Sequence, residues 1–373
     1  MESKKILVVS RSFYPENSPR SFRTTELVKQ FAKDGHDVTL ITFKNDKEHV
    51  AFEKEHNVKI KDLGQLKYKN IDIDKGSKYV KAFKRVARRV AEMVFEYPNI
   101  ELMHLVSKAL KNEKGYDLLV SIAVPHPVHW GVAAARTVKN PIAKTWIADC
   151  GDPYSGFGKK FLSEKASRLK KKALKALLSA DYVTVPFDGA VNAYDSVLRP
   201  KIQIIPQGFN LEGINVFKGE INNPVKTFGY AGSFIPGRRD PRPFIDHLLS
   251  KGYDFKFVIY TKANELFAGY KDIIGDKLVL KSYIPREELL FELSKMDFLI
   301  NFDNRNEVQL PSKIIDYALT TRPILNVDAY DIDEKAIEQF FEGKYDEAAM
   351  KINPEDYNIK TVAGKFIKLA DKS

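Results

Sequence analysis

Three basic side chains in the second half of the chain lie beside turns that could hold an anion. Arg238 and Arg239 follow Gly232 in a loop after an apolar run, and Lys313 comes two residues after Pro311 at the start of an expected helix. Guanidinium groups bind phosphate oxygens in a bidentate manner, and the first N–H groups of a helix favour negative charge. The arrangement therefore predicts a phosphate or diphosphate site. The alternative is an exposed basic loop followed by an ordinary strand-to-helix turn.

The segment 307–323 joins two apolar runs, 298–302 and 324–327, that we expect to be buried strands. Proline is tolerated in the first turn of a helix, and Ser312 or Gln309 can cap the N–H groups that are free there. A strand, a loop and a helix N-terminus in succession favour a ligand site on the loop.

Two histidines and two aspartates in the first half follow successive apolar runs: His126, His129, Asp149 and Asp152. In doubly wound sheets, ligands bind beyond the carboxyl ends of strands. Two carboxylates three positions apart can accept protons or bind hydroxyl groups. Aspartate before proline is also typical of a turn, so a structural role stays open for the two acids.

Arg20 and Arg23 stand at the start of a helix expected over 21–34. Positive charge is unfavourable there because the helix dipole is itself positive at this end. The position indicates contact with an anion, and the alternative is a pair of solvated arginines.

The chain alternates apolar strands with amphipathic helices, and this pattern restarts in the second half. Residues 6–10, 21–34 and 38–42 form one β-α-β unit with an expected right-handed crossover. The sequence therefore predicts an α/β protein with two Rossmann-like domains. The expected parts are a first domain over 1–210, a linker over 211–224 and a second domain over 225–355.

Composition limits the class of protein. A chain of 373 residues is long enough for two domains, and its net charge of +11 indicates an acidic partner such as a membrane surface, nucleic acid or a phosphorylated small molecule. Cys150 is the one cysteine, so no disulfide framework and no cysteine metal site are expected. We find no signal peptide and no apolar run of the ~20 residues that span a bilayer. We expect a cytoplasmic protein, or one on the cytoplasmic face of a membrane.

Two basic segments, 75–91 and 159–178, interleave lysine and arginine with apolar residues at helical spacing. Helices of this kind lie on anionic lipid, where each basic side chain contributes about 1 kcal/mol. The sequence therefore predicts contact with an anionic membrane surface, and the alternative is two solvated helix faces over the core. Aromatic residues are not interleaved as in single-strand binding platforms, so no nucleic-acid partner is expected.

Residues 309–325, QLPSKIIDYALTTRPIL, resemble the donor-binding segment of GT-B glycosyltransferases. That segment carries a Pro-x-Lys-x-x-Glu-Tyr pattern, a turn of small residues and then Arg or Lys before Pro. Many retaining members have two glutamates with seven residues between them. The second falls on Asp316, and the first falls on Val308 with Glu307 beside it. The start of the chain and the run IIPQGFN at 204–210 resemble the same family, so the likeness covers nearly the whole chain.

The resemblance is to retaining bacterial polysaccharide, O-antigen and capsule glycosyltransferases (group 1, family 4-like). It implies a GT-B fold, with two Rossmann-like domains facing across a cleft. The first domain would bind the acceptor, the second would bind the donor, and a helix over about 356–373 would pack back on the first. The implied activity is hexosyl or deoxyhexosyl transfer (EC 2.4) with retention, from a nucleotide-diphosphate sugar to a glycan or polyprenyl-linked acceptor in surface polysaccharide synthesis. The resemblance implies no cofactor and no catalytic metal. From the basic segments we expect the protein to be cytoplasmic and peripheral on the inner face of the cell membrane.

The resemblance also implies a role for each candidate residue. The catalytic residues are His126, Asp149 and Asp152. The donor-binding residues are Gly232, Arg238, Arg239, Lys262, Glu307, Gln309, Ser312, Lys313 and Asp316. The acceptor or cleft residues are Arg20, Arg23 and His129.

Two other functions fit parts of the pattern. A nucleotide-sugar epimerase on the same fold would need more carboxylates in its cleft, and it would leave the basic helices unexplained. A non-catalytic membrane-surface adaptor with a degenerate cleft is favoured by Val308, where the family has glutamate. Turnover of a sugar nucleotide separates the enzymes from the adaptor.

Overall fold

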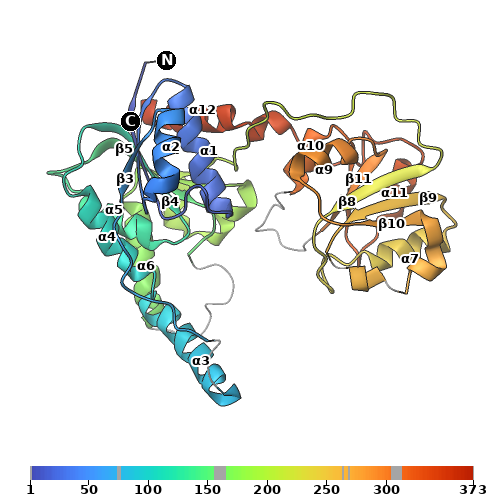
Figure 1. The fold of residues 1–373 in the computed structure, drawn as a ribbon, viewed down its shortest axis with the longest axis horizontal. Helices are drawn as coiled ribbons and strands as arrows, with labels where there is room; N and C mark the ends of the chain where they lie inside the picture. Colours follow the sequence, from blue (N-terminus) through green and yellow to red (C-terminus); the bar gives the residue numbers. More distant parts are fainter. Residues whose placement is uncertain are drawn as a thin grey trace. The chain divides into compact units, whose positions relative to one another are not determined.

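The computed structural model describes residues 2–73, 77–154, 165–262, 264–267, 269–303 and 313–372. Contacts divide the chain into two units, one formed by Met1–Asn210 with Tyr357–Ser373 and the other by Leu211–Asp356. Each unit is built on one sheet of parallel strands with helices on its faces (Figure 1).

The first unit contains a seven-stranded sheet with the order β3-β2-β1-β4-β5-β6-β7. Its strands are β1 (Lys5–Ser10), β2 (Asp37–Thr42), β3 (Lys59–Asp62), β4 (Tyr116–Ala123), β5 (Ala143–Cys150), β6 (Tyr182–Val185) and β7 (Ile202–Ile204). Its helices are α1 (Pro19–Lys33), α2 (Asp46–His56), α3 (Lys78–Phe95), α4 (Ile100–Leu110), α5 (Pro127–Ala135), α6 (Lys165–Leu178) and α12 (Ile359–Asp371), with 3₁₀ turns η1 (Asp188–Ala193) and η2 (Ser196–Lys201).

Strand β1 is an interior strand because both of its faces are apolar. Leu7 and Val9 pack into one hydrophobic cluster, and Ile6 and Val8 pack into another on the opposite face. The pairing is parallel on both sides, with β2 and with β4. The predicted buried strand is confirmed, and the parallel order brings the carboxyl ends of the strands to one edge of the sheet.

The second unit contains a five-stranded parallel sheet with the order β10-β9-β8-β11-β12. Its strands are β8 (Lys226–Ala231), β9 (Phe255–Tyr260), β10 (Leu278–Lys281), β11 (Phe298–Phe302) and β12 (Ile324–Val327). Its helices are α7 (Arg242–Ser250), α8 (Lys271–Ile274), α9 (Arg286–Leu293), α10 (Lys313–Leu319) and α11 (Glu334–Phe341), with 3₁₀ turns η3 (Asn264–Phe267), η4 (Gly275–Lys277) and η5 (Pro354–Tyr357).

Aromatic rings fill the core of the second unit. Phe228 of β8 stacks on Phe298 of β11 with ring centroids 4.8 Å apart, and Phe257 of β9 lies at the same distance on the other side. Continuous apolar strands are expected when helices cover both faces of a parallel sheet. The predicted strands over 298–302 and 324–327 are confirmed as β11 and β12.

The last helix, α12, packs against α1 within the first unit. Phe366 meets Phe31 edge to face at 6.3 Å between ring centroids, and Val362 lies in the same buried cluster. A backbone bridge between Phe209 and Asn358 fixes the start of this helix beside the chain that leaves β7.

Helix α3 contains no buried residue, in contrast to the helices that cover the sheet. Tyr79 is 86% exposed and Phe83 is 74% exposed. Figure 1 shows α3 extending away from the sheet beside α6, with which it is in contact. Part of the second basic segment, 159–164, lies outside the described residues, and the rest forms α6. Across the described ranges, no helix is both long and apolar enough to span a bilayer.

Candidate active site

Two basic side chains, each with a buried nitrogen atom, lie at the carboxyl end of β8 in the second unit. The Lys313 ammonium lies 3.9 Å from the centre of the Tyr230 ring, and Arg239 lies close enough to the Tyr230 hydroxyl to affect its ionisation. Neither Lys313 Nζ nor Arg239 Nε has a hydrogen-bond partner among the described residues. Three separate segments, a strand, a loop and a helix, supply these side chains, so the grouping is a product of the fold.

The electrostatics of this cluster favour an incoming anion. Burial and then the charge of Arg239 hold the pKa of Lys313 well below its usual value. Burial raises the pKa of Tyr230 to about 12, so this ring stays neutral and supplies only its π face to the lysine. A buried charge without a partner is costly, and a bound anion would offset that cost. We call Tyr230, Arg239 and Lys313 the cation cluster.

Helix α10 is held against β8 by the residue that follows Asp316. The Tyr317 hydroxyl accepts a hydrogen bond from the Ala231 N–H at 2.7 Å and donates to the Ala231 carbonyl at 3.2 Å. Gly232, the next residue, has φ of +144° and donates its N–H to the Tyr260 carbonyl. These bonds hold α10 beside the turn that follows β8. The positive φ of Gly232 at this turn favours glycine over other residues.

Asp316 forms an ion pair that the sequence did not predict. Arg286 donates to Asp316 Oδ1 from Nε at 2.9 Å and from Nη2 at 2.6 Å. Both donors converge on one oxygen, which leaves Oδ2 able to accept from a hydroxyl. The signal available in the sequence was a basic residue, Arg286, directly after the turn that follows β10.

The remaining donor-site predictions separate into two groups. Arg238 and Lys262 are exposed, and Lys262 lies 5.6 Å from the Tyr283 ring centre instead of joining the cation cluster. Outside the described residues lie Glu307, Gln309 and Ser312.

In the first unit, Arg23 and Asp149 form a buried ion pair. Arg23 donates to Asp149 Oδ2 from Nε at 3.0 Å and to Oδ1 from Nη2 at 2.9 Å, and it also donates to the Pro206 and Ile205 carbonyls. The Thr184 hydroxyl donates to Asp149 at 2.7 Å. Burial by itself raises the pKa of Asp149, but the Arg23 charge and hydrogen bonds outweigh it, so the pKa is lowered. These groups satisfy one another's hydrogen-bonding capacity and charge. This favours a structural role for the pair over direct contact with a substrate.

Arg20 occupies the space beside Gly151. A Cβ atom on Gly151 would lie 2.2 Å from Arg20 Cζ, so only glycine leaves room for this guanidinium. Burial, opposed by Asp149 and reinforced by Arg23, lowers the pKa of Arg20. Arg20 thus remains a cation whose charge is poorly solvated, as expected of a group that meets an anion.

His126 and Asp152 meet through the backbone. His126 Nε2 lies 2.9 Å from the Asp152 carbonyl oxygen, while the Asp152 side chain is exposed. The His126 ring also packs edge-on against Tyr154 at 5.3 Å. An exposed carboxylate can accept a proton from a hydroxyl, and here the backbone of the same residue contacts the imidazole.

His129 is fully buried, which removes it from direct contact with a ligand in this structure. Its Nδ1 lies 2.8 Å from Ser121 Oγ, and its Nε2 lies 3.4 Å from Cys150 Sγ. Burial, followed by the influence of His126, lowers the pKa of His129 to about 3, so the ring is neutral near pH 7. The side chain belongs to the hydrogen-bonded core between β4 and β5.

Three residues of metal-ligating type, His126, His129 and Cys150, also come together here, with ligand atoms within 4.8 Å of one another. Burial raises the pKa of the Cys150 thiol, whereas a metal ion binds the thiolate. The hydrogen bonds of His129 to Ser121 and Cys150 account for this grouping as part of the core.

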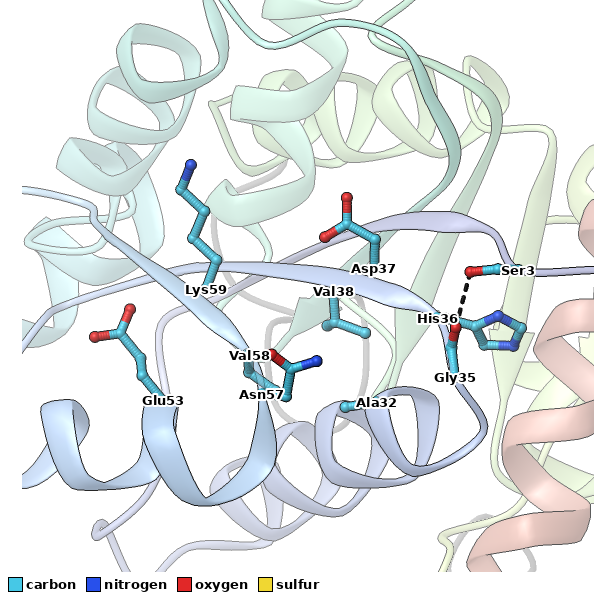
Figure 2. A pocket seen from close by; sticks show the side chains of 10 residues that line it. All are labelled: Ser3, Ala32, Gly35, His36, Asp37, Val38, Glu53, Asn57, Val58 and Lys59. Carbon is cyan, nitrogen blue, oxygen red and sulfur yellow. Dashed lines mark hydrogen bonds between the residues drawn. The ribbon is translucent and has the colours of Figure 1, made fainter.

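Two pockets lie at opposite ends of the strands of the first sheet. A pocket of about 400 Å³ at the carboxyl ends of β1 and β2 is lined by Arg11, Phe13, Tyr14, Pro15, Glu16, Thr42, Phe43, Asn45, His49 and Leu66. A pocket of about 610 Å³ lies at the amino ends of β2 and β3, and Figure 2 shows side chains that line it, Asp37, Lys59, Glu53 and His36 among them. Ligands of parallel sheets bind at the carboxyl ends, so the first of these pockets is the better candidate.

Comparison with known proteins finds solved structures of similar fold. No protein-family model matches the chain, and no curated protein sequence matches it. Among solved structures, the apo lipopolysaccharide outer core galactosyltransferase WaaB matches with a TM-score of 0.59 and 13% identity over 99% of each chain. A glycosyltransferase from Rickettsia africae matches with a TM-score of 0.58 and 12% identity over 100% of this chain and 99% of the other. The UDP-GlcNAc 2-epimerase from Neisseria meningitidis, bound to UDP-GlcNAc, matches with a TM-score of 0.54 and 12% identity over 99% of this chain and 100% of the other.

These likenesses and the two parallel sheets agree with the predicted fold class. The chain has a two-domain α/β fold of the GT-B type, shared with glycosyltransferases and with a sugar-nucleotide epimerase.

Proposed function

We propose that this protein is a glycosyltransferase that moves a hexosyl or deoxyhexosyl group from a nucleotide-diphosphate sugar to a glycan or lipid-linked acceptor in surface polysaccharide synthesis, with retention. The observation that carries the proposal is the cation cluster at the end of β8. Lys313 Nζ and Arg239 Nε are buried there and have no hydrogen-bond partner within the described residues. A diphosphate is an anion that these two groups suit in charge and geometry.

The chemistry follows from the charges. The bond between the anomeric carbon and the diphosphate oxygen breaks, and the acceptor oxygen forms a bond to that carbon. Negative charge develops on the leaving diphosphate, where Lys313 and Arg239 would stabilise it. Asp316, oriented by Arg286, would accept a hydrogen bond from a sugar or ribose hydroxyl. Protein cations would do the work of a metal ion, so we expect activity to persist in a chelator.

The acceptor side is proposed for the first unit. Asp152 would take the proton from the acceptor hydroxyl, because its carboxylate is exposed and its backbone holds His126. Asp149 would contribute by fixing Arg23, while Arg20 would meet an anionic group of a substrate. The 400 Å³ pocket, with exposed Tyr14 and an apolar floor, suits a sugar ring of the acceptor.

A lipid-linked acceptor would be met at an anionic membrane on its cytoplasmic face, through α3 and α6. Apolar residues of α3 such as Tyr79 and Phe83 are exposed, and lysines and arginines are interleaved with them along the helix. Reversing Lys81, Lys84, Arg85 and Arg88 to Glu is expected to reduce flotation with anionic vesicles more than 100-fold, since each basic side chain contributes about 1 kcal/mol. The matched control reverses four exposed lysines of the second unit: Lys218, Lys256, Lys335 and Lys351. Equal loss in both variants would refute a specific role for α3.

The donor is tested by incubating the full chain with a panel of UDP, GDP, ADP, CDP and dTDP sugars. We expect hydrolysis or transfer with one nucleotide class, and abolition of turnover in K313M and in R239M. Turnover unaffected by either change would refute the assigned site. Absence of binding and turnover across the panel would favour the non-catalytic adaptor.

An epimerase is the second candidate, because one structure of similar fold is a UDP-GlcNAc 2-epimerase. It would convert a sugar nucleotide to its epimer without an acceptor. Chromatography of the sugar nucleotide after incubation without acceptor separates the two, since a transferase leaves the sugar configuration of unreacted donor intact.

A further inference from the structure

Helix α3 is fastened to the rest of the first unit at its carboxyl-terminal end. Glu96, the residue that directly follows α3, has a left-handed φ of +53°. Residues other than glycine rarely adopt this conformation. The next residue, Tyr97, stacks on Tyr68 at 5.5 Å and donates its hydroxyl to the Lys69 carbonyl at 2.7 Å. The unburied residues of α3 are thus followed directly by a segment that is anchored to the rest of the first unit.

Tyr154 joins that anchored segment to the candidate acceptor side. Its hydroxyl donates to Glu96 Oε2 at 2.8 Å. Burial and then the Glu96 charge raise the pKa of Tyr154, so the phenol keeps its proton and remains a donor. The ring of the same residue lies edge-on to His126 at 5.3 Å and to Trp130 at 5.6 Å.

Two further contacts complete the connection. His126 Nε2 meets the Asp152 carbonyl, and Asp152 is only two residues before Tyr154. Trp130 is contacted on its face by Lys172 of α6 at 5.2 Å. Residues of α6 and the residue that follows α3 therefore contact one aromatic pair, Trp130 and Tyr154, and the Tyr154 ring packs directly against His126.

We propose that Tyr154 is a positioning residue that couples contact between α3 and an anionic lipid surface to the placement of His126 and Asp152. The inference rests on the function proposed above. A shift of α3 on the surface acts on Glu96, and the Tyr154 hydroxyl and ring carry it to the imidazole. In the absence of that bond, α3 would still bind lipid, but His126 would no longer respond.

The test compares wild type with Y154F and E96A in the full chain. The readout is the ratio of transferase activity with anionic vesicles to activity without them. A hydrogen bond to a charged group contributes enough to change this ratio by about tenfold or more. We expect Y154F and E96A each to lose that stimulation, the double variant to lose no more than either, and vesicle flotation to stay at the wild-type level.

The matched control is Y270F, because Tyr270 donates to the Asp246 carboxylate at 2.8 Å in the second unit. Its stimulation ratio is expected to equal that of wild type. Full stimulation of Y154F by vesicles would overturn the proposal. Equal loss of activity by Y154F with and without vesicles would also overturn it, since that is the behaviour of a residue needed only for folding.

A second readout does not depend on turnover. Amide hydrogen exchange over residues 126–135 is expected to slow when wild type binds anionic vesicles, and to stay unchanged in Y154F. If no donor is turned over but this difference is seen, the proposed enzyme is wrong and the coupling is upheld. If vesicles bind and exchange is the same in both proteins, the coupling is wrong.

Discussion

Buried arginine and lysine side chains behave differently in the two units. In the first unit, Arg23 meets Asp149, Thr184 supports the acid, and backbone carbonyls take the remaining donors. In the second unit, Lys313 lies over the Tyr230 ring and Arg239 lies near the Tyr230 hydroxyl, and no described acid meets Lys313 Nζ or Arg239 Nε. The first arrangement is complete without a ligand, and the second favours an anion. Residue type and burial alone do not separate these cases, but the inventory of partners does.

The largest expected effect is on the complete pair. R23A would leave the Asp149 carboxylate buried without its partner, and removing one member of such a pair costs about 3–5 kcal/mol. We expect the free energy of unfolding, from urea titration followed by circular dichroism, to fall by that amount. The double variant R23A/D149A should lose less than the sum of R23A and D149A. A cost below about 0.5 kcal/mol for R23A, the range of ordinary surface changes, would contradict the assignment of a structural pair.

The opposite sign is expected in the cation cluster. K313M removes a buried ammonium that has no hydrogen-bond partner among the described residues, and it keeps a side chain of similar length. Functional sites commonly carry such a cost, so unfolding free energy should rise by about 0.5–2 kcal/mol. Lys256→Met, at an exposed position on β9, is the matched control and should change stability by less than about 0.5 kcal/mol. If K313M is destabilised like R23A, then Lys313 has a partner in solution and the contrast between the units fails.

A smaller effect concerns protons. The folded pKa of Lys313 is lowered below its unfolded value, so between the two values the unfolded chain binds more protons. The contribution of Lys313 to stability is therefore least favourable below the folded pKa and improves as pH rises toward ~10.4, the unfolded value. A bound diphosphate would favour the ammonium form, so nucleotide binding in this pH window should take up protons. Titration calorimetry in buffers of different ionisation enthalpy measures that uptake, and K313M should abolish it. Equal uptake in K313M would assign the proton to another group.

Much of the fold could be predicted from local pattern. The apolar runs at 6–10, 298–302 and 324–327 are strands because parallel sheets are covered on both faces, so their sequences need no alternation. The basic helix expected over 75–91 is observed as α3, from Lys78 to Phe95. Strand β3 was not predicted, because its sequence Lys59–Asp62 is short and holds a single apolar residue, Ile60.

The pairings within the candidate site could not be predicted in this way. Arg23 and Asp149 are 126 positions apart, and their contact depends on the order of the strands. Residues from several elements together determine that Arg23 has an acidic partner and that Lys313 Nζ has no described hydrogen-bond partner. His129 shows the same limit, since its neutrality results from burial among Ser121, Cys150 and His126. Tyr230 had a usable signal, as an aromatic residue two positions before the glycine at the strand end, and so did Tyr317 beside Asp316.

The most direct test of the account is calorimetric titration of nucleoside diphosphates, without sugar, into wild type, K313M and R239M. We predict that one nucleoside diphosphate binds wild type, and that each variant binds it at least about tenfold more weakly, because charge-assisted hydrogen bonds to phosphate are lost. Lys256→Met should bind like wild type. Equal binding by wild type, K313M and R239M, or no binding of any nucleoside diphosphate to wild type, would contradict the claim that the cation cluster holds the donor diphosphate.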